Sequence, residues 1–440
     1  MDTQDGLRKA KEAEAKGDIQ GAFDTLRKTI KDATDVNFQG LARLPLRVES
    51  RPPGAKVTIT LPTGEAVEAG LTPTQTFWYP YQGKTLVRVE AKGFEEKVLE
   101  REGIEKDTRA VEVVNLQRNI RWHREAGAAV EGQPGLTPGL VLVGTRGGLF
   151  RALSAESGDE KFQLRTEHLS GISGGILVSG SSAWFGGNDG EAFAVDLEKH
   201  DFRWRRKTQA PVSTTPVRCG GLAVFADTEG RLYAFKAESG DPAWTADLKC
   251  PTAGDILAVG DLILAGLSDD RLVAVKGSDG STAWTAKLSG PPVGLAADGR
   301  GGVLAGTETS TVERVDLAKG TVGWVAKTDA PVHAKPVARP EGILAVSTQG
   351  TLFRLDASTG KESSPRATLG RSLEGGCAVS GNLLYAATSN GILVAWDIQG
   401  SRVLWQLSEL GQLHGDPAVS AGILVIATAD SAGSVVVVDP

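Results

Sequence analysis

A unit of about forty residues recurs along most of this 440-residue chain, and this repeat limits the possible folds more than any other feature. In one copy, "GLAVFADTEGRLYAFKAESGDPAWTADL" (221–248), two apolar runs flank Gly230, and a Ser-Gly turn leads on to Trp244. The glycine slot returns every 40 to 42 residues and is occupied in order by Gly148, Gly190, Gly230, Asp270, Ser310, Gly350, Gly391 and Gly433. A regular period of this length, with short strands and turns inside each unit, is typical of the blades of a β-propeller.

A bulky residue follows each slot by fourteen positions and is expected to be a structural anchor between blades. These residues are Phe162, Trp204, Trp244, Trp284, Trp324 and Trp405, with Ser364 as the exception. The corresponding position of the last copy falls beyond Pro440, whereas Trp122 lies forty residues before Phe162. We therefore expect residues 118–125 to supply the missing outer strand of the last blade, because this would close an eight-bladed ring and remove a free sheet edge.

Composition agrees with an all-β repeat and argues against several functions. Glycine is abundant at 55 residues, whereas aromatic residues make up 6% of the chain, which favours tight turns between short strands. The net charge of −6, without a long basic run, predicts no nucleic-acid partner. No apolar segment approaches the roughly 18 residues of a membrane span. We expect a monomer with no direct membrane span.

The repeat resembles the PQQ-like β-propeller family, whose units combine a glycine turn, an "LYALD"-like strand, a small turn and a tryptophan. The matching stretches include "GEAFAVDLEKHDFRW" (190–204), "GTLFRLDASTGK" (350–361) and "GILVAWDIQGSRVLW" (391–405). The resemblance implies a propeller over residues 118–440, in which the tryptophans dock between blades. The blade with Ser364 in place of tryptophan is then expected to be the least stable.

Residues 44–117 have a different pattern, with short alternating strands separated by Pro-Gly turns, which predicts a small β-sandwich. This segment is similar to a PEGA domain in its Pro52-Pro53-Gly54-Ala55 turn, its Thr72-Pro73 pair and its Gly93-Phe94 pair. Residues 1–40 place apolar side chains at helical spacing on both sides of Gly17-Asp18, which predicts a helical hairpin. That hairpin resembles a tetratricopeptide-type helix pair without its tryptophan and tyrosine. We expect the natural protein to continue upstream or the hairpin to dock on the sandwich.

Catalytic chemistry is not expected. The propeller family includes quinone-dependent dehydrogenases, which typically hold the quinone beneath two adjacent cysteines. Cys219, Cys250 and Cys377 are scattered and have neither that arrangement nor zinc-ligand spacing. The chain also lacks a nucleophile elbow and a phosphate-binding glycine loop. We therefore expect no catalytic residue, no metal and no cofactor.

Candidate binding residues lie at two places. His333 and His414 each follow an anchor by nine positions, ahead of an innermost strand, and Ser213 occupies the equivalent position of another copy. These three side chains are expected to line one mouth of the central channel, where a partner could bind. The run "TFWYPYQG" (76–83) adds an aromatic group, Trp78, Tyr79 and Tyr81. Alternation along a strand puts Trp78 on the face opposite Tyr79, so we expect Trp78 to pack against the propeller or the helix pair.

The sequence therefore predicts a mainly β protein: an eight-bladed β-propeller preceded by a small PEGA β-sandwich and a short N-terminal helical hairpin. We expect a non-enzymatic scaffold or sensor module that binds another protein, within a bacterial envelope-associated or receptor-kinase-type protein. A polysaccharide-binding module and a degenerate quinoprotein enzyme are the alternatives. The expected location is outside the cytoplasmic membrane if the chain is part of a longer protein, and cytoplasmic otherwise.

Overall fold

The structure is a computed structural model that describes residues 3–33, 43–102, 109–166, 170–369, 372–420 and 422–440. Two compact units are present: one comprises Met1–Asn119 together with Val403–Gln406, and the other comprises Ile120–Arg402 and Leu407–Pro440. Each unit is described separately. Within the described residues, neither helix has the length and apolar character that crossing a bilayer requires.

The N-terminal unit begins with a helical hairpin made of α1 (Thr3–Ala15) and α2 (Ile19–Asp32). Gly17 connects the helices with a φ of +79°, and the Asp18 carboxylate caps α2 by accepting a hydrogen bond of 2.8 Å from the Gly21 amide. Phe23 and Leu26 on α2 are buried, whereas Leu7 on α1 keeps 39% of its surface exposed. The hairpin therefore has one closed apolar face and one that is partly open.

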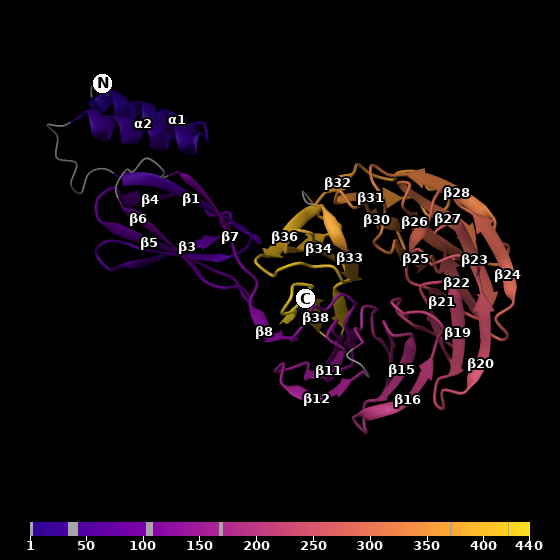
Figure 1. Ribbon diagram of the computed structural model, residues 1–440. Coiled ribbons are helices and arrows are strands. Elements are labelled where there is room, and N and C mark those ends of the chain that lie inside the picture. The colour runs from indigo at the N-terminus through magenta and orange to yellow at the C-terminus, as the bar shows by residue number, and fades with distance from the viewer. Residues whose placement is uncertain (1–2, 34–42, 103–108, 167–169, 370–371, 421) are drawn as a thin grey trace. The chain divides into compact units, whose positions relative to one another are not determined.

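Two sheets follow the hairpin, and their strands are numbered in chain order (Figure 1). The strands are β1 (Arg43–Arg51), β2 (Lys56–Thr60), β3 (Ala66–Leu71), β4 (Phe77–Pro80), β5 (Lys84–Glu90), β6 (Lys97–Glu102) and β7 (Val111–Asn115). One sheet has the order β4-β1-β7 and the other β3-β2-β5-β6. Alternating side chains such as Leu46, Val57 and Val87 are fully buried between them, together with Phe23 of α2. The hairpin therefore shares its core with the sheets, and its Gln20 side chain accepts a hydrogen bond of 3.0 Å from the Ala110 amide.

The second unit consists, over its described residues, of eight four-stranded antiparallel sheets, here numbered one to eight. Sheets one and two contain β9 (Gly135–Leu136), β10 (Leu140–Gly144), β11 (Leu149–Ser154), β12 (Glu160–Arg165), β13 (Leu177–Ser179), β14 (Ser182–Gly187), β15 (Glu191–Asp196) and β16 (Asp201–Lys207). Sheets three and four contain β17 (Val217–Cys219), β18 (Leu222–Ala226), β19 (Arg231–Lys236), β20 (Pro242–Asp247), β21 (Leu257–Val259), β22 (Leu262–Gly266), β23 (Arg271–Lys276) and β24 (Thr282–Lys287).

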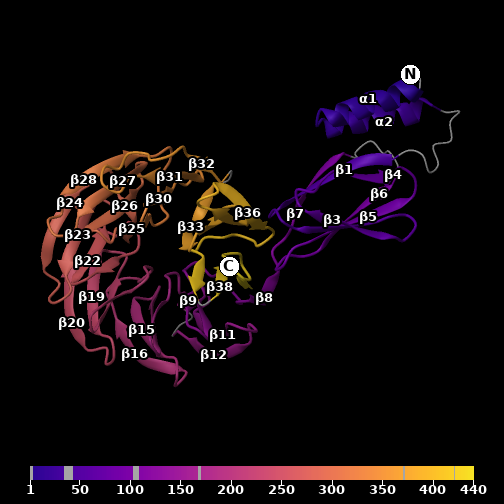
Figure 2. The same cartoon turned by 180° about the vertical axis from the view of Figure 1, so that it is seen from behind.

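The second half of the ring repeats this order. Sheets five and six contain β25 (Pro292–Ala297), β26 (Gly302–Thr307), β27 (Thr311–Asp316), β28 (Val322–Lys327), β29 (Val337–Arg339), β30 (Gly342–Val346), β31 (Thr351–Leu355) and β32 (Ala367–Thr368). Sheet seven contains β33 (Leu373–Ser380), β34 (Leu383–Thr388), β35 (Leu393–Asp397) and β36 (Arg402–Leu407). Figures 1 and 2 show these sheets following one another around a common axis.

Sheet eight joins the two ends of this unit. It consists of β37 (Ala418–Ser420), β38 (Ile423–Ala427), β39 (Ser434–Val438) and β8 (Ile120–Glu125). β8 pairs antiparallel with β39, and Trp122 lies opposite Val437. An early strand thus completes the last sheet, and Trp122 packs in one buried cluster with Val141 of sheet one and Val425 of sheet eight.

Five tryptophan anchors make the same contact with the following sheet. In each case the indole Nε1–H donates to a carbonyl oxygen 33 residues later, at distances between 2.7 and 3.1 Å. The pairs are Trp122 with Ala155, Trp204 with Ala237, Trp244 with Gly277, Trp284 with Leu317 and Trp324 with Ala357. The anchors therefore supply both apolar contact and a hydrogen bond between neighbouring sheets.

A glycine beneath each of these indoles leaves room for it. A Cβ added to Gly240 would lie 2.6 Å from Trp204, and at Gly158, Gly280, Gly320 and Gly360 the distance to the anchor is 2.5 or 2.6 Å. Where the anchor is Phe162, this place holds His200, whose ring stacks on the phenyl at 4.4 Å between centroids. Where the anchor is Ser364, the equivalent residue in sheet seven is Ser401, also at positive φ. Glycine thus faces each of these five tryptophan anchors and is replaced where the anchor is Phe162 or Ser364.

Candidate functional site at the inner rim

The inner rim is defined here as the short segments that precede the innermost strands of the ring. Ser213, His333 and His414 lie on it, ahead of β17, β29 and β37, and all three are exposed. His333 Nε2 lies 3.1 Å from the Glu308 carboxylate oxygen Oε2. In the third copy of the repeat, the segment ahead of β17 forms this rim, and the strand itself begins only at Val217.

The structure brings a lysine and two aspartates together just below the exposed histidines. Lys335 Nζ lies 3.2 Å from Asp255 Oδ2 and 3.4 Å from Asp416 Oδ2. These residues belong to sheets six, four and eight, which are not neighbours in the ring. Only groups at the axis can meet in this way, so the ion pairs bridge the ring across its centre.

Opposing influences act on the ionisation of this cluster. Burial acts to lower the pKa of Lys335, but the carboxylates of Asp255 and Asp416 outweigh it, and the pKa of the lysine is raised. Burial raises the pKa of Asp416, although the Lys335 ammonium opposes this. The three groups carry a net charge of about −1 when all are ionised, and the lysine is held in its charged form.

Hydrogen bonds extend the cluster to other sheets. Asp255 Oδ1 accepts from the Thr215 amide at 2.8 Å, and Thr215 Oγ1 in turn accepts from the Gly175 amide at 3.2 Å. On the other side, the Gln133 side-chain amide donates to the Pro417 carbonyl at 3.3 Å. We call Gln133, Thr215, Asp255, Lys335 and Asp416 the inner belt. It links sheets one, two, three, four, six and eight at one level.

Histidine and belt residues lie on the same side of their segments. His333 and Lys335 are two residues apart, as are His414 and Asp416, and burial alternates along 332–336. Side chains two apart in an extended segment point the same way, about 6.6 Å apart. The exposed histidines therefore form a surface directly above the ion-paired level.

Sequence reasoning missed the belt, although a signal for it exists. Every belt residue lies eleven positions after an anchor position, from Trp122 to Gln133 and from Trp324 to Lys335. Equivalent positions of sheets arranged around an axis lie at the same level, so a lysine and two aspartates found there can form ion pairs. The binding position predicted from the sequence, which carries His333 and His414, lies two residues before the belt position in each repeat.

Nothing in the described part of the chain resembles a metal site: no group of three or more histidine, cysteine or acidic side chains is gathered there. The cysteines are also apart, since Cys219 lies on β17, Cys250 after β20, and Cys377 on β33. Burial, and secondarily Asp416, raises the pKa of Cys377, so its thiol stays protonated at neutral pH.

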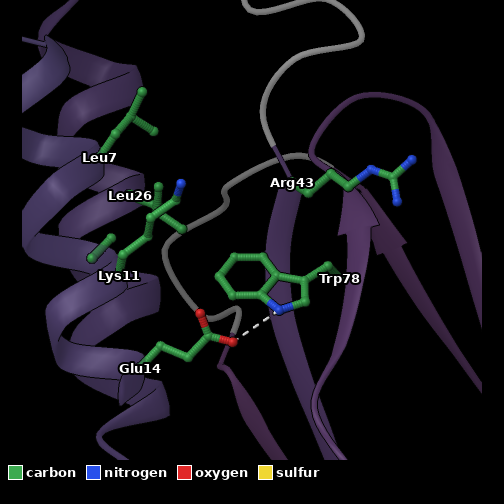
Figure 3. A pocket seen from close by; sticks show the side chains of 7 residues that line it. Leu7, Lys11, Glu14, Leu26, Arg43 and Trp78 are labelled. Atoms are coloured by element: carbon green, nitrogen blue, oxygen red, sulfur yellow. Dashed lines mark hydrogen bonds between the residues drawn. The ribbon is translucent and has the colours of Figure 1, made fainter. Parts of the chain in front are cut away.

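The aromatic group of the N-terminal unit is divided by the fold. Tyr79 is 1% exposed and packs in the core, so it does not offer a binding surface. Trp78 Nε1 donates to Glu14 Oε1 of α1 at 3.1 Å, and the indole forms the floor of a pocket of about 270 Å³ beside Leu7 and Lys11 (Figure 3). Trp78 thus packs against the helix pair. Tyr81 is half-buried, and its hydroxyl accepts a hydrogen bond of 2.6 Å from the side-chain Nε2 of Gln82.

Four-stranded antiparallel sheets that follow one another around an axis, with an N-terminal strand completing the last sheet, define a β-propeller. The match to known families is more specific. The chain belongs to the family described as outer membrane protein assembly factor BamB, whose profile matches residues 108–218, 164–308 and 365–440. The expected PQQ-like propeller is confirmed at this level.

Solved structures share the propeller at low sequence identity. BamB from Moraxella catarrhalis is 18% identical, with a TM-score of 0.63 over 73% of this chain and 99% of that chain. A europium-containing methanol dehydrogenase is 13% identical, with a TM-score of 0.60 over 73% and 93%. The C-terminal WD40 domain of Sif2 is 12% identical, with a TM-score of 0.62 over 73% and 99%. These likenesses show the fold alone, and no curated protein sequence matches the chain.

Proposed function

We propose that this chain is a non-enzymatic scaffold that binds another protein at the inner rim. The observation that carries the proposal is the closure of the axis by Lys335, Asp255 and Asp416 directly beneath exposed Ser213, His333 and His414. Ion pairs across the ring hold the rim segments in place. A surface that is rigid before binding loses little conformational freedom when a partner docks.

The finer description of the fold forms part of this proposal. We infer that sheets one to eight are the eight blades of one closed propeller, and that residues 44–117 form a PEGA domain. Support for the latter comes from Gly54 and Gly93, which have φ of +84° and +80° in the turns of the Pro52-Pro53-Gly54-Ala55 and Gly93-Phe94 motifs. The similarity to an outer membrane assembly factor favours a bacterial envelope location and a monomeric chain that engages a larger assembly.

A degenerate quinoprotein is the second candidate, favoured by the likeness to the methanol dehydrogenase fold. The residues present do not fit a quinone site of the expected kind. Cys219 on β17, Cys250 after β20 and Cys377 on β33 are not adjacent in the chain, and Lys335 with its two aspartates occupies the axis. Titration with calcium and pyrroloquinoline quinone tests this candidate directly. Saturable binding of the quinone that Lys335→Met abolishes would favour the quinoprotein over the scaffold.

The scaffold proposal is tested by crosslinking and by matched histidine variants. A photoreactive amino acid placed at Ser213 should capture a partner from the native cell extract, and the purified partner should bind the propeller directly. His333→Ala/His414→Ala should weaken that binding at least tenfold without changing the melting temperature. His123→Ala is the matched control, because His123 is exposed on outer strand β8. Equal binding by all variants would contradict an inner-rim site.

A further inference from the structure

The missing anchor leaves an opening at the outer edge of sheet six. Ser364 stands where the other sheets have an aromatic anchor, and a groove of about 600 Å³ lies beside it, between sheets six and seven. This volume is within the range of about 300–1,000 Å³ found for small-ligand pockets. The groove belongs to the propeller and is separate from the inner rim.

The outer strand of sheet six is also shortened next to the groove. β32 has two residues and pairs with β31 only through Thr351 and Leu352. In sheet five, the equivalent pairing of β27 with β28 involves five residues of β27. Pro365 follows Ser364 and cannot donate to a ladder, which explains why the strand is interrupted here. The outer edge of the propeller is therefore incompletely paired at sheet six.

A buried donor without a partner lines this groove. Trp396 is 5% exposed, and its indole Nε1–H has no acceptor among the described residues. The Ser364 hydroxyl is buried and has no partner there either. Leaving a buried N–H unpaired is costly, so two unpaired groups in one groove point to an acceptor that binds from outside.

Arg354 makes this groove cationic. Its Nη2 donates to the Ile398 carbonyl at 2.7 Å and to Ser401 Oγ at 2.8 Å, and the Ile398 carbonyl is the equivalent of those that accept from the anchor indoles. Both acceptors are neutral, and no carboxylate pairs with Arg354 among the described residues. Arg366 and Glu341 line the same groove but have partners of opposite charge, Glu362 at 2.7 Å and Arg339 at 2.5 Å, so Arg354 carries the unpaired positive charge. The Arg366 guanidinium also lies 4.8 Å from the centre of the Phe353 ring.

Sheet one shows which aromatic side chain fits an anchor position that faces a residue other than glycine. Phe162 fills the anchor position of sheet one although the residue facing it is His200 and not glycine. Ser401 likewise carries a Cβ where an indole needs glycine. A phenyl ring is therefore the aromatic group compatible with the Ser401 side of the groove.

We propose that this groove binds an extended segment of a partner protein that carries a phenylalanine next to a glutamate or aspartate. The phenyl ring fills the place of the missing anchor, and the carboxylate pairs with Arg354 and accepts from Trp396 Nε1–H. Charge-assisted hydrogen bonds and cation–π contact favour this pair of side chains. The proposal rests on the proposed function only in taking the occupant to be a protein.

The first experiment titrates the full chain with acetylated Gly-Phe-Glu-Gly amide and follows the ¹⁵N–¹H indole signal of Trp396, assigned with Trp396→Phe. We expect a saturable shift of this signal. Peptides with alanine for phenylalanine or glutamine for glutamate should bind at least tenfold more weakly. An unmoved signal, or equal binding of the glutamine peptide, would overturn the proposal.

The second experiment fills the groove with the ring's own anchor. Ser364→Trp/Ser401→Gly recreates the tryptophan–glycine pair of the other sheets and should abolish peptide binding while the melting temperature stays equal or rises. Persistent binding to this folded variant would place the peptide elsewhere and refute the groove. His333→Ala/His414→Ala should leave the peptide affinity unchanged, so failure of the inner-rim site and failure of the groove give different results.

Discussion

Restoring the anchor of sheet six should stabilise the propeller, and the tryptophan–glycine pairing predicts how. We expect Ser364→Trp/Ser401→Gly to raise the local stability of sheets six and seven by about 1–3 kcal/mol. A buried aromatic side chain covers roughly 150–250 Å², which at about 25 cal/mol per Å² gives an upper bound of about 4–6 kcal/mol. Arg354 loses two hydrogen bonds, to the Ile398 carbonyl and to Ser401 Oγ, and the new indole bond offsets one of them, which leaves a cost of about 1 kcal/mol.

The two terms at Ser401 nearly cancel, and the conformational entropy lost in ordering the new indole keeps the gain below the upper bound. Replacing Ser401 by glycine costs about 1 kcal/mol in chain entropy, while removing the serine side chain from a φ of +49° returns a similar amount. Ser364→Trp alone should give little or no gain, because in five other sheets a Cβ at the facing position would lie within 2.6 Å of the indole. Gly360→Ser, in the intact neighbouring contact with Trp324, is the mirror variant and should lose stability.

Hydrogen exchange measured by mass spectrometry tests these expectations sheet by sheet. A gain of 1–3 kcal/mol corresponds to exchange about 5- to 150-fold slower in peptides from β31, β35 and β36. Before the substitution, these peptides should exchange faster than those of sheet four, whose anchor is Trp284. If Ser364→Trp alone stabilised as much as the double variant, the glycine would have no steric role, and the reasoning would be refuted.

Three further predictions concern the anchors, the inner belt and the sandwich core. Trp204→Ala should cost about 3–5 kcal/mol in a denaturant titration, because it empties a site that is 5% exposed and breaks the bond to the next sheet; a loss below 1 kcal/mol would contradict the anchor role. Lys335→Met should cost about 1–3 kcal/mol at pH 7, less than for a fully buried pair because the lysine side chain is 38% exposed. The loss should be smaller at pH 4, because the raised pKa of Asp416 allows this carboxylate to be protonated there. The triple variant Asp255→Asn/Lys335→Met/Asp416→Asn should recover most of the lost stability at pH 7. Equal losses at both pH values would argue against the ion pairs. Burial raises the pKa of Tyr79 from 10.0 to about 12, so the folded unit resists ionisation, and its stability should fall by about 2–3 kcal/mol as pH rises from 10 to 12; Tyr79→Phe should flatten that part of the stability curve.

The repeat made most of the propeller accessible from the sequence. The spacing of the glycine slots and anchors predicted the strands of each sheet. The last copy has no anchor after Gly433, which predicted that the segment with Trp122 completes the last sheet, and Trp122 does pair opposite Val437. These inferences succeed because every sheet must bury its faces against a neighbour, which imposes one pattern on all copies. Regular elements with many copies are therefore the part of this protein that a single sequence specifies best.

The inner belt was inaccessible for a different reason. Lys335 lies 80 residues after Asp255 and about the same distance before Asp416 along the chain. Local patterns do not reveal contacts across the axis of a ring. Only comparison of equivalent positions in non-adjacent repeats indicates that such residues meet. Trp78 is similar, since its partner Glu14 belongs to a helix 64 residues earlier.

Deviations from the repeat are the most informative positions for function, because the repeat itself accounts for packing. Ser364 and Ser401 deviate together: one lacks the indole, and the other lacks the glycine that an indole requires. Loss of the anchor alone would leave a glycine facing it and room for its return, whereas the paired change adds a side chain where the indole would lie. Arg354 then takes the carbonyl of Ile398. The groove is consequently a rebuilt contact with its own polar chemistry, and a defect in packing alone would explain neither the arginine nor the unpaired Trp396 donor.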